Sequence, residues 1–96
     1  MRADYDSEGD TLAIELVDDV DHADFGDDSV DPQAVVAIRE GKPVIIDVIG
    51  ARHDVDGPLR AVATRYDLDV EALLAAARSA LAAPDRVVVL DVRGRV

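Results

Sequence analysis

The sequence contains no cysteine and no tryptophan, and its only aromatic residues are two tyrosines and one phenylalanine. The lack of cysteine excludes a disulfide framework, a thiolate nucleophile and a cysteine-ligated zinc site. No apolar stretch approaches the length of a membrane span, and the first residues turn acidic where a signal peptide would be apolar. We therefore expect a cytoplasmic protein that has no membrane partner.

Positive charge is also scarce, since Lys42 is the only lysine and the chain has 10 basic residues against 21 acidic ones. Residues 1–56 carry 4 basic and 16 acidic side chains, whereas residues 57–96 carry 6 and 5. The formal net charge of −11 therefore comes from the first half of the chain. Such a field repels phosphate backbones, so we expect no nucleic-acid partner and favour a basic protein as the partner.

A chain of 96 residues has the size of one domain, so we expect residues 1–96 to form a single domain. The first half predicts two β-hairpins, because its short runs alternate in period two or are rich in β-branched residues. Gly41 suits a left-handed position in the second turn. Residues 18–31 are polar and rich in aspartate, which predicts a flexible loop. The expected strands are residues 2–6, 11–17, 34–39 and 43–49.

The second half predicts two helices and a final strand. Pro58 suits the first turn of a helix over residues 58–66, and Asp69 is a good N-cap for a helix over residues 70–82. The valine-rich segment 86–92 predicts the last strand. The expected fold class is α+β: an antiparallel β-meander of two hairpins, with both helices packed on one face. The last strand of the second hairpin carries branched apolar residues on both faces, so we expect the C-terminal half to cover its second face.

Residues 4–15 nearly satisfy the pattern of an EF-hand calcium loop, which needs acids at positions 1, 3 and 5, glycine at 6 and glutamate at 12. An EF-hand also needs a helix before the loop, whereas the last positions here alternate as a strand does. We therefore expect an acidic hairpin turn and no calcium site. The matching residues are Asp4, Asp6, Glu8, Gly9 and Glu15.

The aspartate-rich loop could gather a hard cation, because carboxylate oxygens suit magnesium and calcium. His53, beside Asp54 and Asp56, could serve as a general acid or base. These residues have no fixed ligand spacing, and the chain has no glycine-rich phosphate loop or serine-nucleophile motif around Ser7, Ser29 or Ser79. We assign no catalytic, cofactor-binding or metal-binding residue, and a metal-dependent small enzyme is an alternative. The loop residues in question are Asp18, Asp19, Asp21, His22, Asp24, Asp27 and Asp28.

Residues 59–73 are spaced like a helix-turn-helix, with Ala63 before the turn and Leu73 after it. Asp67 stands where a turn glycine is usual, and the second helix offers almost no polar side chain that could read base edges. A helical pair packed on the sheet is the favoured interpretation. A DNA-binding regulator is a further alternative.

The order Tyr-Asp-x-Glu-x-Asp-x-Leu at residues 5–12, continued by Ile14 and Leu16, is similar to the opening of a family of small bacterial proteins of unknown function. Residues 41–48, Gly-Lys-Pro-Val-Ile-Ile-Asp-Val, resemble the second hairpin of that family. The resemblance covers about residues 4–52 and implies an antiparallel two-hairpin meander. Because the family has no established activity, the resemblance implies no functional residue.

The charge asymmetry and the apolar residues on both faces of the second hairpin indicate that the protein functions through a binding surface. The sequence contains no group of residues that suggests catalysis instead. These features predict a non-catalytic protein-protein interaction module, or a regulatory accessory protein of an antitoxin-like kind. We expect it to be a homodimer that meets a basic partner.

Overall fold

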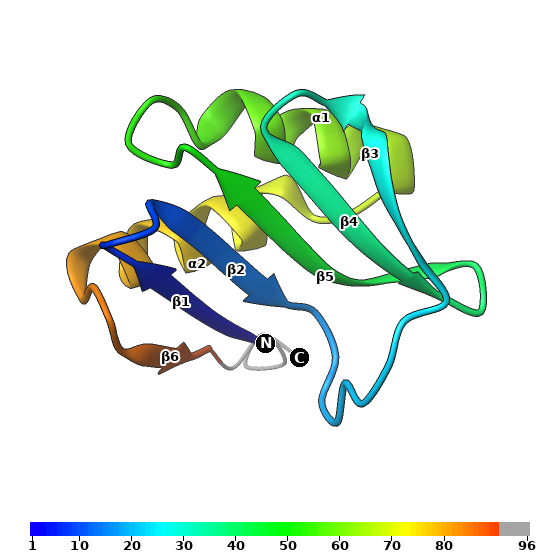
Figure 1. Cartoon of the computed structure of the whole chain (residues 1–96), viewed down its shortest axis with the longest axis horizontal. Helices are drawn as coiled ribbons and strands as arrows, with labels where there is room; N and C mark the ends of the chain where they lie inside the picture. The colour runs from blue at the N-terminus through cyan, green and yellow to red at the C-terminus, as the bar shows by residue number, and fades with distance from the viewer. Residues whose placement is uncertain (91–96) are drawn as a thin grey trace.

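The computed structural model describes residues 1–90, which have the α+β fold expected from the sequence (Figure 1). The elements are β1 (Arg2–Asp6), β2 (Thr11–Glu15), β3 (Phe25–Asp31), β4 (Ala34–Arg39), β5 (Lys42–Ile49), α1 (Asp56–Tyr66), α2 (Val70–Ala82) and β6 (Val87–Val89). The strands form one six-stranded antiparallel sheet in the order β3-β4-β5-β2-β1-β6. Each hairpin thus contributes two neighbouring strands, and β2 and β5 join the hairpins.

Both predicted hairpins are present. β1 pairs with β2 along its whole length. β4 and β5 are joined by Glu40 and Gly41, whose φ angles of 54° and 77° give the left-handed pair that a tight two-residue hairpin turn requires. The predicted strand 11–17 is shorter in the structure, since β2 ends at Glu15.

The prediction of a flexible loop over residues 18–31 is wrong for its second half. Residues 25–31 form the edge strand β3, which pairs with β4 and has a register shift between Asp27 and Asp31. The sequence of this segment is poor in strand-forming residues, so tertiary contacts decide its conformation. One such contact comes from the Tyr66 hydroxyl of α1, which donates a hydrogen bond to Asp27. Charged side chains and a broken register are typical of an edge strand that avoids pairing with another chain.

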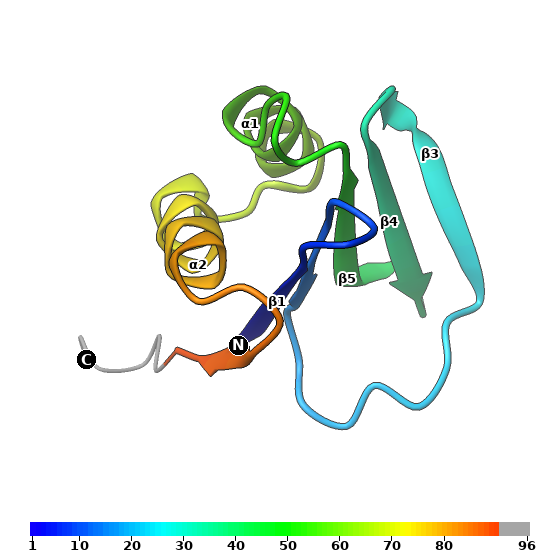
Figure 2. The same ribbon diagram turned by 60° about the vertical axis from the view of Figure 1, so that its left-hand side comes forward.

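Each helix covers one half of the sheet, and Figure 2 shows both helices on the same side of it. α1 contacts β3, β4 and β5, whereas α2 contacts β1, β2 and β6. The helices bury one stripe each, and a leucine or valine buried in this way contributes about 1.5–3 kcal/mol. The largest fully buried side chains are those of Leu12, Ile14, Val36, Ile46, Val48, Pro58, Leu59 and Val62.

The helix ends follow the capping chemistry expected of them. Asp69 is the N-cap of α2, as predicted, and its carboxylate accepts hydrogen bonds from the backbone N–H groups of Glu71 and Ala72 at 3.1 and 3.2 Å. α1 begins at Asp56, two residues earlier than predicted, and Pro58 lies in its first turn. It ends at Tyr66, and its C-cap is Asp67, whose φ of 55° is left-handed.

The expected cover of the second sheet face is not found among residues 1–90. Both helices pack on the face that carries Val44, Ile46 and Val48. Ile45 and Ile49 project from the other face, where Figures 1 and 2 show no helix. The physical reason is that the two helices lie side by side, so that a single face of the wide sheet accommodates both.

The predicted strand 86–92 is present as β6, which pairs with β1 through residues 87–89. Residues 91 and 92 of that prediction lie outside the described residues. In the part of the chain that the structure describes, neither helix is long and apolar enough to cross a membrane.

Candidate functional site

The sheet face that the helices leave uncovered is the candidate functional surface, and we name it the open face. Alternation along each strand sends every second side chain to this face. Three large apolar residues on it are well exposed: Ile49 at 52 %, Val87 at 63 % and Val89 at 71 %. The open face consists of Arg2, Asp4, Asp6, Thr11, Ala13, Glu15, Val35, Ala37, Arg39, Ile45, Asp47, Ile49, Val87 and Val89.

A continuous row of side chains crosses five strands in the middle of the open face. Val87 lies opposite Asp4, and Asp4 lies opposite Ala13. Ala13 lies opposite Asp47, which in turn lies opposite Val35. The two carboxylates therefore flank the methyl group of Ala13, and a valine closes the row at each end.

The surroundings of Asp47 disfavour its ionised form. Burial of its carboxyl group raises the pKa of Asp47 above the ordinary value of 3.8, and the nearby carboxylate of Asp4 raises it further. No hydrogen bond or positive charge within the described residues contributes to this shift. A carboxylate that loses water without gaining a partner raises the free energy of the folded state. Asp47 is thus a half-buried acid whose charge is not compensated by the described part of the chain.

The neighbouring row mixes apolar and charged residues. Val89 lies opposite Arg2, Arg2 opposite Glu15, Glu15 opposite Ile45, and Ile45 opposite Ala37. Together with Asp4, Asp6 and Asp47, this row gives four carboxylates and Arg2, and the second arginine of the face, Arg39, donates a hydrogen bond to Asp21. The open face therefore mixes apolar and charged residues and has a net negative charge.

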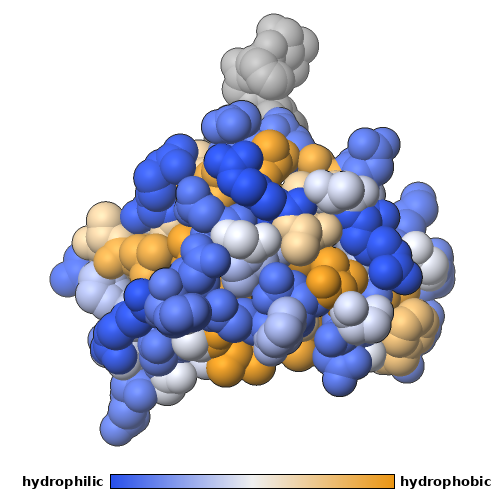
Figure 3. Space-filling view, turned by 90° about the horizontal axis from the view of Figure 1, so that it is seen from above, coloured by the Kyte–Doolittle hydropathy of each residue, from blue (hydrophilic) through white to orange (hydrophobic). Residues whose placement is uncertain are grey.

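Elsewhere on the molecule, exposed apolar residues are scattered. Seen from above in Figure 3, the molecule is mainly hydrophilic, and its hydrophobic residues stand in separate small groups. Two further exposed apolar residues, Val17 and Phe25, also lie off the open face. Phe25 is 60 % exposed and lies opposite Ile38, whose side chain points to the helices.

The acids of the calcium-like pattern do not converge. Asp6 accepts hydrogen bonds from the backbone N–H groups of Glu8 and Gly9 at 3.1 and 3.3 Å, which shapes the turn between β1 and β2. Asp4 and Glu15 instead project from the open face at successive outward positions of two strands. The pattern is therefore divided between a hairpin turn, as expected, and a sheet surface.

A polar network at one end of the sheet was not predicted from the sequence. The Tyr5 hydroxyl donates a hydrogen bond to Asp10 at 2.7 Å, and the backbone N–H of Arg52 donates to the same oxygen at 2.9 Å. The Tyr5 bond is the main reason that the pKa of Asp10 is lowered. Nearby, Ser7 donates two hydrogen bonds to Asp85 from its backbone N–H and its hydroxyl. Because the network ties three distant segments together, its evident role is structural.

The candidate metal residues are dispersed. No group of three or more histidine, aspartate and glutamate side chains within residues 1–90 is placed to hold a metal ion. The Asp21 carboxylate lies 2.8 Å from His22 Nδ1 and 3.2 Å from the Arg39 guanidinium. These contacts lower the pKa of Asp21, and the hydrogen bond from His22 is the largest cause. His53 lies apart in the turn after β5, where its N–H binds the carbonyl of Gly50. The His22 and Asp21 side chains are 60 % and 77 % exposed, so their pairing contributes little to stability.

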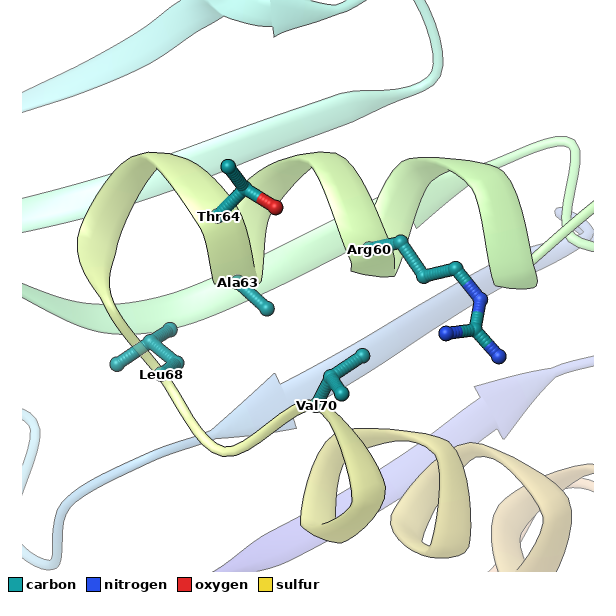
Figure 4. A pocket seen from close by; sticks show the side chains of 5 residues that line it. All are labelled: Arg60, Ala63, Thr64, Leu68 and Val70. Carbon is teal, nitrogen blue, oxygen red and sulfur yellow. The ribbon is translucent and has the colours of Figure 1, made fainter.

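The helix-turn-helix-like segment forms the helical pair expected from its apolar spacing. α2 turns Leu73, Leu74 and Ala77 toward the sheet, so these residues belong to the core. A shallow pocket lies between the two helices (Figure 4). In that view Arg60 reaches from α1 toward the side of α2, and Val70 lies on the first turn of α2. One arginine and one threonine, Thr64, beside three apolar residues give this pocket no constellation for chemistry.

Comparison with family models, with curated proteins and with solved structures finds no match for the chain. The likeness to the small bacterial family therefore stays a prediction.

Proposed function

We propose that the chain is a non-catalytic protein-protein interaction module that binds its partner through the open face. The observation that carries the proposal is a sheet face that neither helix covers and on which exposed apolar residues lie among carboxylates. Large exposed apolar patches on soluble proteins mark interaction sites far more often than they are left without a role. A regulatory accessory protein of an antitoxin-like kind, acting in the cytoplasm, fits such a surface.

The charge of the open face favours a basic partner. Its four carboxylates outnumber its two arginines, and they belong to a chain whose net charge is −11. Opposite charges speed the encounter of two proteins, whereas like charges placed across an interface disfavour the wrong partner. The same field disfavours nucleic acid and anionic membrane surfaces as partners.

Self-association, which the sequence predicts, would use a different surface. Two open faces placed against each other would bring two negatively charged surfaces together, because each carries more carboxylates than arginines. The edge of β6 carries valines and no charge, in contrast to the acidic, irregular edge at β3. An unprotected edge strand is a template for pairing with another chain. Light scattering would give twice the monomer mass of 10.3 kDa for such a homodimer.

The two alternatives have less support. A metal-dependent enzyme would need a ligand cluster, and the described residues form none. A DNA-binding regulator would need polar side chains on the outer surface of α2, where Glu71, Arg78 and Ala82 are the exposed residues. No observation favours either function over the interaction module.

Matched variants and affinity capture from the cells that produce the protein would test the proposal. The variant Ile49→Asp/Val87→Asp adds two charges to the open face, and Val17→Asp/Phe25→Asp adds two charges at exposed apolar positions elsewhere. We expect a protein captured by the wild type and the control to be lost with the open-face variant. Identical capture by all three forms would contradict the proposal.

A further inference from the structure

The spacing of Asp4 and Asp47 sets the size of the group that can bind between them. Two strand spacings separate these residues, because Ala13 of β2 lies between them in the same row. The two Cα atoms are therefore about 10 Å apart. Ala13 has only a methyl group, so the space above it is bounded by a carboxylate on each side. The planar guanidinium of an arginine, which has hydrogen-bond donors on opposite edges, can bridge such a gap with bonds of about 2.9 Å.

The surroundings of this space favour a cation from a protein over a free ion. A valine lies at each end of the row, and Ile45 and Ile49 project beside it. A free cation would leave these apolar side chains exposed, whereas a polypeptide can cover them with apolar residues on either side of its charged group. Arginine is the cation of choice for buried contacts, because its guanidinium is weakly hydrated and binds carboxylates in a fixed geometry.

We infer that the partner of the open face is a protein segment that places an arginine over Ala13, between Asp4 and Asp47, with apolar residues flanking it. The inference rests on the proposed function and adds the chemistry of the partner. Charge complementarity favours this occupant over a second copy of the chain, because a second open face carries more carboxylates than arginines and has the same sign of charge. Bringing an arginine to Asp47 compensates a charge that burial disfavours.

Peptide selection against the purified, full chain tests the inference. A displayed library of random 12-residue peptides is selected on the wild type, and enriched peptides are synthesised for affinity measurement. We expect an arginine flanked by apolar residues in the enriched peptides. Replacing that arginine with citrulline, its neutral isostere, should weaken binding at least tenfold. Raising the salt concentration should weaken binding as well.

Two double variants locate the contact. Asp4→Asn/Asp47→Asn removes the charges and keeps the side-chain shapes, and we expect it to bind the peptides at least tenfold more weakly. Asp56→Asn/Asp67→Asn removes two exposed charges at the ends of α1, in the helix layer, and should bind as the wild type does. Circular dichroism confirms that each variant is folded. Peptides that lack a basic residue, or that bind Asp4→Asn/Asp47→Asn within twofold of the wild type, would overturn the inference, as would a library that yields no peptide dependent on these acids.

A third variant, Ile49→Ser/Val87→Ser, separates the inference from the proposed function. Peptides that lose binding to this variant but not to Asp4→Asn/Asp47→Asn would support the open face and overturn the arginine contact. Peptides insensitive to both variants would overturn both. A dimer in light scattering that dissociates in Ile45→Ser/Ile49→Ser, which leaves β6 unchanged, would show that a second copy occupies the open face, and would also overturn the inference.

Discussion

The Tyr66 hydroxyl at the end of α1 donates a hydrogen bond to the Asp27 carboxylate on the edge strand β3. The contact joins residues 39 positions apart in the sequence and ties the edge of the sheet to the helix layer. Ser29 reinforces it, since its backbone N–H and hydroxyl bind Asp27 at 2.9 and 2.6 Å. These bonds hold in place a segment whose composition is that of a loop.

Removing the Tyr66 hydroxyl should loosen β3. We expect Tyr66→Phe to lower the free energy of unfolding by about 0.5–1.5 kcal/mol, because one partly buried hydrogen bond is lost. Amide hydrogen exchange in residues 25–31 should become faster, while that in β1 and β2 stays unchanged. Tyr5→Phe is the matched control, because its hydroxyl binds Asp10 at the other end of the sheet. Unchanged exchange in β3 of Tyr66→Phe would show that β3 is held by other contacts.

The Asp27 carboxyl group of this cluster should titrate at unusually low pH. Hydrogen bonds from the Ser29 hydroxyl and from Tyr66 lower the pKa of Asp27 from 3.8 to about 2. Because the pKa of Asp27 is lower in the folded than in the unfolded state, its ionised carboxylate stabilises the fold above pH 4. This stabilisation is lost as the pH falls toward 2. Carboxyl NMR titration should find this pKa, and Ser29→Ala should raise it more than Tyr66→Phe does. An Asp27 that titrates near 3.8 would mean that these bonds do not persist in solution.

The strands, helices and caps that local chemistry determines were predictable, whereas β3 was not. The Glu40-Gly41 turn, the N-cap Asp69 and the apolar stripes of both helices follow from residue type and spacing alone. β3 depends on pairing with β4 and on a hydrogen bond from α1, and neither leaves a periodic pattern in its own sequence. Local residue propensity does not predict a strand that forms because of contacts with residues distant in the sequence.

Neutralising Asp47 should stabilise the fold at neutral pH. Burial and then the charge of Asp4 raise the pKa of Asp47, so its ionisation opposes folding. The stability conferred by its protonated form is complete below the unfolded pKa and is lost as the pH rises through the folded pKa. We expect Asp47→Asn to unfold at higher urea concentration than the wild type at pH 7 and at the same concentration near pH 3.

Asp67→Asn, at an exposed position after α1, is the control for the change in net charge, and its effect should be small. Equal effects of Asp67→Asn and Asp47→Asn would show that the stabilisation comes from the change in net charge and not from the surroundings of Asp47 on the open face.

Two substitutions in the turn between the helices should have different effects on stability. Asp69→Ala removes the N-cap of α2 and should lower the free energy of unfolding by about 1 kcal/mol. Asp67→Gly relieves a left-handed residue with φ of 55° and should leave stability unchanged or raise it. Urea unfolding of both variants measures the difference. If Asp69→Ala unfolded as the wild type does, the cap would not contribute in solution.

The sequence predicts an interaction surface but not its position. Apolar residues on both faces of the strand that contains Ile45 and Asp47 led us to expect that the C-terminal half covers the second face, whereas both helices pack on the first. The adjacency of Asp4 and Asp47 depends on β2 lying between β1 and β5, which is a property of the sheet topology. The sequence separates these two acids by 43 positions, and no spacing rule connects them.

Photo-crosslinking at single positions tests most directly whether the open face is the binding surface. A benzophenone amino acid is placed at Ile49 on the open face or at Phe25 off it, two apolar positions that are 52 % and 60 % exposed. After irradiation of the producing cells, we expect a discrete adduct with a partner protein from position 49 and none from position 25. An adduct from position 25 alone, or equal adducts from both positions, would contradict binding through the open face.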